Sequence, residues 1–205
     1  MSYQIKIPSY TCGGEGCIEN VPSIIEKEHA RKIMVFTDKG IRATGLLDVL
    51  TKILDTTDAE YKIFDDLTPE PAYQDVERVM DEADQYEGDF IIAIGGGSVM
   101  DAAKLCSVLK GASYTVKDLL KDPGIAEKQI KTLMIPTTCG TGSEATCNAI
   151  VAIPEEQSKK GIVNDNMIPD YVFLDSQMIR RLPKSIIAAT GVDALAHVVC
   201  LLYTS

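Results

Sequence analysis

Short apolar runs alternate along the chain with amphipathic segments of helical period. The run KIMVFTD (32–38) predicts a strand, and IRATGLLDVLTKIL (41–54) repeats its apolar residues at helical spacing. YKIFDD (61–66) predicts a second strand, and DVERVMDEADQY (75–86) predicts a helix that follows the prolines of TPEPAY. This alternation is typical of a parallel sheet with helices on its faces.

The alternation continues through the middle of the chain and then ends. DFIIAIGGG (89–97), KTLMIPTT (131–138) and DYVFLD (170–175) predict further strands, and DAAKLCSVLKG (101–111) predicts a helix between the first two. RRLPKSIIAATGVDALAHVV (180–199) then predicts only helix. The last strand of the series is therefore expected before residue 180.

Two further features divide the chain. NAIVAI (148–153) and KKGIV (159–163) flank a polar turn and predict an antiparallel excursion from the parallel sheet. Pro183 marks the change from strands to helix. We therefore predict an α/β domain with a parallel sheet over residues 1–183, followed by the truncated start of an all-helical domain over residues 184–205.

The composition narrows the classes of partner. A chain of 205 residues, 45% of them hydrophobic, is long enough to bury the core of one full domain. The net charge of −10 comes from acids scattered among lysines, so nucleic acid and anionic membranes are not expected as partners. The six cysteines show no CxxC spacing, which favours reduced and mostly buried thiols.

The chain is also expected to carry no targeting or membrane segment. No apolar run is expected to approach the roughly 20 residues that cross a bilayer. The start MSYQIKIPSY lacks the basic and then apolar layout of a signal peptide. A cytoplasmic location is the resulting expectation.

A first glycine turn follows an apolar strand. Gly95, Gly96 and Gly97 lead into a helix that is expected to start near Ser98. Glycines let the backbone approach a ligand closely, and the N–H groups of a helix start attract phosphate. The turn matches neither G-x-G-x-x-G nor a P-loop. Alone, it is equally consistent with a simple tight connection.

A second turn, IPTTCGTGSEAT (135–146), favours the ligand interpretation. It places the hydroxyls of Thr137, Thr138 and Thr141 beside two glycines, again directly after an apolar strand. Strand ends of a parallel sheet gather along one edge, which is where ligands bind. Two such ends suggest one extended ligand, and a dinucleotide is the natural candidate.

Asp38 lies at the end of the strand 32–38. A carboxylate there could accept hydrogen bonds from a ribose diol and would repel a 2′-phosphate. Asp is also a favoured helix N-cap, so the residue could equally cap the helix that follows Gly40. The sequence leaves both interpretations open.

Asp193 and His197 lie four residues apart near the end of the chain. On an α-helix this spacing amounts to about 40° around the axis, so both side chains project from one face. A carboxylate and an imidazole suit Fe(II), Zn(II) or Mn(II). Alone, such a pair is more typical of a hydrogen bond on a helix surface.

Three segments, in this order and at these separations, resemble the iron-containing (group III) alcohol dehydrogenase family. They are IIAIGGGSVMDAAK (91–104), IPTTCGTGSEAT (135–146) and GVDALAH (191–197). The likeness also covers GGEGCIEN, FTDKG and PEP, so it runs from about Cys12 to Val199. It implies a dinucleotide-binding α/β domain for NAD(P) and an all-helical domain that holds one divalent metal, usually iron and sometimes zinc.

The resemblance assigns roles to individual residues. Asp38 would bind the adenosine ribose and favour NAD over NADP, and Asp193 and His197 would be the first two ligands of Fe(II) or Zn(II). The other implied cofactor residues are Gly95, Gly96, Gly97, Ser98 and Asp101 at the pyrophosphate, and Thr137, Thr138, Thr141 and Lys160 along the cleft.

The chain departs from the family pattern after His197. The family's metal site needs two more histidines, and the only other histidine, His29, belongs to the α/β domain and is expected to be a solvated helix residue. We therefore expect weak NAD binding and no turnover of alcohol by this chain. The closing CLLYTS (200–205) differs from the family's usual continuation and is interpreted as foreign sequence, such as a library adaptor read in frame.

The implied activity is reversible hydride transfer between NAD(H) and a small alcohol or aldehyde. The alternatives are a glycerol or polyol dehydrogenase-like relative, a metal-free reductase, a dehydroquinate-synthase-like cyclase and a non-catalytic NAD-binding fragment. Asp193 with His197 argues against the metal-free reductase, and TTCGTGSEAT (137–146) argues against the cyclase.

Two further expectations concern the thiols near the cleft and the assembly. Cys139 and Cys147 are expected to be passive, because no histidine or lysine partner is evident. The resemblance also implies a homodimer or larger homo-oligomer, with Tyr3–Pro8 as a candidate edge strand.

Overall fold

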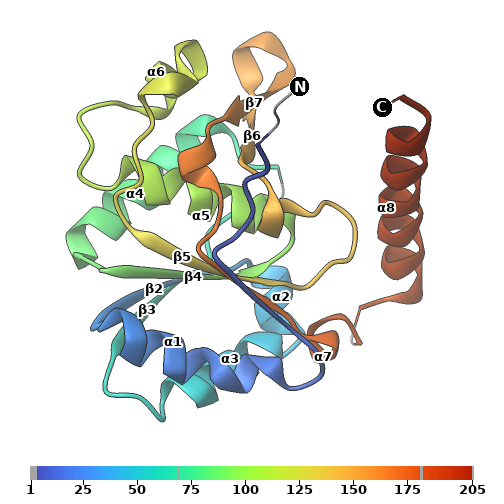
Figure 1. The fold of residues 1–205 in the computed structure, drawn as a ribbon. Coiled ribbons are helices and arrows are strands. Elements are labelled where there is room, and N and C mark those ends of the chain that lie inside the picture. The colour runs from blue at the N-terminus through green and yellow to red at the C-terminus, as the bar shows by residue number, and fades with distance from the viewer. Residues whose placement is uncertain (1–3, 69, 181, 205) are drawn as a thin grey trace.

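The computed structural model describes residues 4–68, 70–180 and 182–204, and its centre is one six-stranded sheet (Figure 1). The strand order is β1-β8-β5-β4-β2-β3, and neighbouring strands run parallel. The strands are β1 (Tyr10–Gly13), β2 (Lys32–Phe36), β3 (Glu60–Phe64), β4 (Phe90–Gly95), β5 (Lys131–Pro136) and β8 (Tyr171–Leu174). The predicted α/β fold with a parallel sheet is confirmed.

Helices cover both faces of this sheet (Figure 1). One face carries α1 (Val21–Glu28), α2 (Lys39–Ala43), α3 (Leu46–Leu54) and α7 (Ser176–Ile179). The other face carries α4 (Tyr73–Tyr86), α5 (Gly97–Leu109) and α6 (Val116–Lys121). Short 3-10 turns lie at η1 (Cys17–Asn20), η2 (Pro123–Ile125), η3 (Ser143–Ala145), η4 (Pro154–Glu156) and η5 (Asp165–Met167).

The central strand β4 shows how the sheet separates two apolar cores. Ile91 and Ala93 belong to the core beneath α4 and α5, whereas Phe90, Ile92 and Ile94 belong to the core of the opposite face. Successive side chains of a strand point to opposite faces, and all five are buried here. A continuous apolar run is therefore what a central parallel strand requires.

β6 (Asn148–Ile153) and β7 (Ser158–Val163) form the predicted antiparallel excursion. The hairpin lies outside the main sheet, and Val151 and Ile162 join the core beneath α4 and α5. The amide of Ala152 donates to the carbonyl of Pro71 at 3.0 Å. This bond joins the hairpin to the segment that precedes α4.

One predicted helix is divided in the structure, and another begins later than predicted. Residues 41–54 contain the end of α2 and all of α3, because Gly45 between them adopts φ 73°, a left-handed conformation that ends a helix. Residues 180–199 follow α7 and contain most of α8 (Lys184–Thr204), and Pro183 precedes this new helix. The domain division between residues 183 and 184 coincides with the start of α8 and stays a prediction.

The predicted edge strand Tyr3–Pro8 has no strand partner within this chain over the described residues, and its pairing with a second copy stays a prediction. Residues 4–8 contain no strand, and Tyr3 lies outside the described residues. The edge is formed by β1 instead, where the backbone from Tyr10 to Gly13 pairs with β8. Ile5 and Ile7 are largely exposed, so the alternating pattern at the start of the chain does not face a core.

α8 stands beside the sheet domain rather than on one of its faces (Figure 1). Its segment Lys184–Tyr203 is long and apolar enough to cross a membrane, judged by length and composition alone, with a mean hydropathy of 1.9. The expectation that no apolar run approaches this length is therefore wrong, because small residues link the larger apolar ones. Core helices of large domains have the same character, and Asp193 beside His197 would be costly within hydrocarbon.

Candidate functional site

The first glycine turn lies at the carboxyl end of β4, in the middle of the sheet. Gly95 ends the strand and α5 begins at Gly97. The unpaired N–H groups of the helix start therefore lie at the carboxyl ends of the strands. A Cβ atom on Gly95 would lie 2.7 Å from the Cβ of Val99. The connection therefore has no room for a side chain, and it presents backbone at the sheet edge.

The second glycine turn contacts the first. It follows β5, the neighbour of β4, and the amide of Thr137 donates to the carbonyl of Gly95 at 2.9 Å. A Cβ atom on Gly97 would lie 3.0 Å from Oγ1 of Thr141. The structure thus brings the two turns together at one edge, as expected for consecutive parallel strands.

A cavity of about 310 Å³ lies where the two turns meet the β6–β7 hairpin. Gly97 and Ser98 line it from the first turn, Thr141 and Ser143 from the second, and Asn148 from β6. The N–H groups at the start of α5 carry partial positive charge, and the hydroxyls can donate hydrogen bonds. This arrangement favours a ligand with anionic oxygens, such as a phosphate.

The cation that lines this cavity is Lys159. It lies across the hairpin from Ala152, another lining residue, and its Nζ is 2.6 Å from Oε1 of Glu70. Lys160 is exposed, does not line the cavity, and pairs with Glu156 at 2.7 Å. Neighbouring side chains of a strand point to opposite faces, so only one of two consecutive lysines can face the cavity. Lys159 rather than Lys160 thus lies at this cavity, and a contact of Lys160 with the coenzyme stays a prediction.

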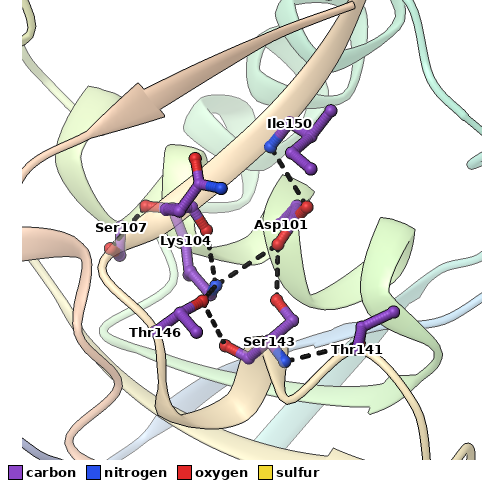
Figure 2. Close-up of polar contacts among 8 residues, drawn as sticks. Asp101, Lys104, Ser107, Thr141, Ser143, Thr146 and Ile150 are labelled. Atoms are coloured by element: carbon purple, nitrogen blue, oxygen red, sulfur yellow. Dashed lines mark hydrogen bonds and ion pairs between the residues drawn. The ribbon is translucent and has the colours of Figure 1, made fainter. Parts of the chain in front are cut away.

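A buried ion pair connects α5 to the second turn (Figure 2). Oδ1 of Asp101 accepts from Oγ of Ser143 at 2.5 Å, and its Oδ2 accepts from the amide of Ile150 at 3.1 Å. Nζ of the fully buried Lys104 lies 3.3 Å from Oδ1 of Asp101. Burial lowers the pKa of Lys104, and the carboxylate of Asp101 opposes this shift.

This network gives Asp101 and Lys104 roles that the sequence did not predict. Both carboxylate oxygens of Asp101 are engaged by protein donors, and its predicted contact with pyrophosphate stays a prediction. Lys104 is missing from the predicted site residues. Its sequence signal is a lysine three positions after Asp101, in a helical segment that is otherwise mostly apolar.

The three threonines of the second turn occupy different places. Thr141 lines the first cavity, and Thr138 lines a second cavity of about 420 Å³ beside Cys139 and Ala194. Thr137 is fully buried, and its hydroxyl has no hydrogen-bond partner among the described residues. The three threonines predicted to line one cleft thus lie at two separate cavities and at one buried position.

Asp38 caps α2. Its Oδ1 accepts a hydrogen bond from the amide of Ile41 at 2.9 Å, which confirms the capping interpretation. The residue is half-buried and follows β2, the other neighbour of β4. Asp38 therefore lies at the same sheet edge as the two turns, and its contact with a ribose stays a prediction.

α8 contacts the second turn through Thr190. Oγ1 of Thr190 lies 3.3 Å from Sγ of Cys139, and a Cβ atom on Gly140 would meet Cβ of Thr190 at 2.9 Å. Asp193 and His197 lie within about 60° of Thr190 around the helix axis, at about 100° per residue. Both predicted metal ligands therefore project from the side of α8 that faces the second turn.

Asp193 and His197 lie on one face of α8, and their role as metal ligands stays a prediction. Oδ1 of Asp193 lies 3.9 Å from Nδ1 of His197, and both side chains are more than half exposed. One ion could be shared across such a gap with a small rotamer change. Within residues 4–68, 70–180 and 182–204, no group of three or more histidine, cysteine or acidic side chains could hold a metal ion.

The expected solvation of His29 is confirmed, although it lies just after α1 rather than within it, whereas the cysteines differ from their expectation. His29 is exposed and follows α1 in a left-handed conformation, φ 54°, so it ends the helix. Cys17 and Cys106 are buried, Cys12, Cys139 and Cys147 are half-buried, and Cys200 is exposed. Fewer thiols are buried than expected.

Comparison with known proteins assigns the chain to a family. Residues 8–176 match the family of iron-containing alcohol dehydrogenases. Long-chain-alcohol dehydrogenase 1 of Geobacillus thermodenitrificans (strain NG80-2) is 32% identical over 199 residues, which cover 96% of this chain and 50% of that protein. The chain thus spans about half the length of the curated relatives that it matches.

Solved structures agree with this assignment. An iron-containing alcohol dehydrogenase from Thermotoga maritima superposes with a TM-score of 0.86 at 34% identity, over 96% of this chain and 54% of that one. Sulfoacetaldehyde reductase from Bifidobacterium kashiwanohense, solved in complex with NAD+, gives 0.84 at 26% identity, over 94% and 51%. The chain belongs to the iron-containing alcohol dehydrogenase family.

Proposed function

We propose that the chain is the coenzyme-binding half of an NAD-dependent and metal-dependent alcohol dehydrogenase. Its reaction would be reversible hydride transfer between NAD(H) and a small alcohol or aldehyde. The observation that carries this proposal is the first cavity, which combines the start of α5, the second glycine turn and the cation of Lys159. Helix N–H groups and a lysine together attract a pyrophosphate.

Each part of the site has a binding role in this proposal. The backbone from Gly95 to Ser98 binds the pyrophosphate together with Thr141. A phosphate oxygen then replaces Glu70 as the ion-pair partner of Lys159. Asp38 accepts from the adenosine ribose and disfavours NADP, because its carboxylate would repel a 2′-phosphate. Thr138 lies at the second cavity, beside α8, where the reacting end of the coenzyme would reach.

Asp193 and His197 would hold the metal, Fe(II) or Zn(II), as two of its ligands. A carboxylate oxygen and an imidazole nitrogen suit either ion. When bound, such an ion acts as a Lewis acid toward an alcohol or carbonyl oxygen. Two ligands bind an ion weakly, so the 205-residue chain is expected to bind NAD without turning over alcohol.

Two alternatives remain within the proposal. A glycerol or polyol dehydrogenase-like relative would use the same coenzyme cavity, and a non-catalytic NAD-binding fragment would use only that cavity. We further expect a homodimer or larger homo-oligomer and a cytoplasmic location. We expect no nucleic-acid or membrane partner.

Isothermal titration of the 205-residue chain with NAD and NADP tests the coenzyme assignment. We expect saturable binding of NAD and at least tenfold weaker binding of NADP. Lys159→Met should weaken NAD binding, whereas its neighbour Lys160→Met, which removes the same charge from the opposite face of β7, should change it less than twofold. Equal effects of the two substitutions would contradict the site. Steady-state assays with Fe(II) or Zn(II) test the expected lack of turnover.

A further inference from the structure

Lys104 donates to three segments of the chain around the first cavity. Besides its contact with Asp101, its Nζ donates to Oγ1 of Thr146 at 3.0 Å and to the carbonyl of Asn148 at 2.7 Å (Figure 2). An ammonium has three donor hydrogens, so these contacts satisfy it fully. Such contacts are what offsets the cost of burying a charge completely.

The partners of the Asp101–Lys104 pair all line the cavity. Lys104 holds Thr146 and Asn148, and Asp101 holds Ser143 and the amide of Ile150. These four residues line the cavity from the side of the second turn and β6. The position of that wall is therefore fixed from α5.

The same helix supplies the opposite wall. Gly97 and Ser98 line the cavity from the first turn of α5, and Asp101 and Lys104 follow in the next turn of that helix. α5 thus carries both the N–H groups that would bind a phosphate and the ion pair that holds the facing wall. A shift of the facing wall would separate Thr141 and Ser143 from the start of α5.

We propose that Lys104 is a positioning residue for pyrophosphate binding. It sets the distance between the start of α5 and the residues that follow the second glycine turn, and it does not touch the ligand. This role rests on the coenzyme site proposed above. A buried ion pair is often replaceable by apolar residues of equal volume without loss of stability, so stability alone gives little reason for a lysine at this place.

Lys104→Met tests the proposal, with Lys128→Met as the matched control. Lys128 is also an ion-paired lysine whose pKa is lowered by burial: its Nζ lies 3.3 Å from Asp170 and 3.0 Å from the carbonyl of Ile168. It does not line the first cavity. The 205-residue chain and both variants are titrated calorimetrically with ADP-ribose, which contains the pyrophosphate, and with adenosine, which does not.

Lys104→Met should weaken ADP-ribose binding at least tenfold and adenosine binding less than twofold. Lys128→Met should lower the unfolding temperature but change neither affinity more than twofold. Unchanged ADP-ribose binding in Lys104→Met, or an equal loss for both ligands, would overturn the positioning role while leaving the coenzyme site intact. An unmodified chain that binds no ADP-ribose would overturn the coenzyme site, and the role with it.

Asp101→Asn provides a second variant in case Lys104→Met does not fold. It keeps the side-chain volume and an acceptor for Ser143, but it removes the charge that faces Lys104 and the acceptor for the amide of Ile150. The expected result is the same selective loss, three- to tenfold for ADP-ribose and less than twofold for adenosine. Equal losses for both ligands would again overturn the proposal.

Discussion

Nζ of Lys159 lies 2.6 Å from Oε1 of Glu70, and both residues line the first cavity. Glu70 adopts φ 56°, in the left-handed region that side-chain-bearing residues rarely occupy. Its amide donates to Oγ of Ser98 at 3.3 Å, so it is tied to the start of α5. A bound pyrophosphate would compete with Glu70 for Lys159.

Glu70→Gln is expected to strengthen NAD binding two- to fivefold. Removing the carboxylate leaves Lys159 available to a phosphate, and an exposed ion pair contributes up to about 1 kcal/mol. Titration calorimetry of the variant measures the change. Glu156→Gln, which removes the partner of Lys160, should leave the affinity unchanged, and weaker binding in Glu70→Gln would contradict the competition.

Gly97→Ala is expected to weaken NAD binding at least fivefold. The new Cβ would lie 3.0 Å from Oγ1 and 3.1 Å from Cγ2 of Thr141, so the two turns would have to separate by a few tenths of an ångström. Gly191→Ala is the control, because a Cβ atom there meets nothing within 4 Å. The experiment compares both Kd values, and similar values for the two variants would show that the contact between the turns is unimportant.

Asp38→Asn separates the capping role of this side chain from its proposed role in choosing the coenzyme. Asparagine caps helices about as well as aspartate, so the unfolding temperature should change little. Loss of the negative charge should improve NADP binding at least fivefold and leave NAD binding within threefold. Measurement of both affinities checks this, and an unchanged preference would place the ribose elsewhere.

Tyr171→Phe is expected to reduce the loss of stability between pH 10 and pH 12. Burial, together with its hydrogen bond to Glu28, raises the pKa of Tyr171 to about 12, against about 10 in an unfolded chain. A raised pKa in the folded state gives stability that is present below the unfolded pKa and is lost as the pH rises through the folded one. Urea midpoints across this range should fall less in the variant than in the parent chain. Tyr203→Phe, at an exposed position, should behave like the parent.

A chain shortened after Pro183 is expected to fold and to bind NAD within twofold of the full chain. The buried residues of both cores extend only to Met178, and no buried core residue of the described part lies in α8. Chemical denaturation and calorimetry of the shortened chain test this expectation. A loss of cooperative unfolding would contradict the proposed division between residues 183 and 184.

The sheet and its two turns could be predicted because they depend on local pattern. A parallel strand buried on both faces gives a continuous apolar run such as the one before Gly95, and a tight strand-to-helix connection requires glycine. The parallel order of the strands then brings their ends to one edge. Which side chains face the cavity at these strand ends depends on tertiary contacts instead.

Three outcomes illustrate this limit. Lys159 and Lys160 are neighbours of the same type, and only the hairpin register decides which one faces the cavity. Two of the three partners of Lys104, Thr146 and Asn148, lie more than 40 residues away in sequence. α8 satisfies a membrane criterion by length and composition alone, and its most apolar stretch is not buried among the described residues.

Hydrogen exchange with and without NAD tests the central claim most directly, since it locates the coenzyme on the fold. Exchange should slow on NAD addition at the amides from Gly96 to Ser98 and from Thr141 to Ser143. It should stay unchanged around His29, which lies near the amino ends of the strands. Protection around His29 without protection of the two glycine turns would contradict it.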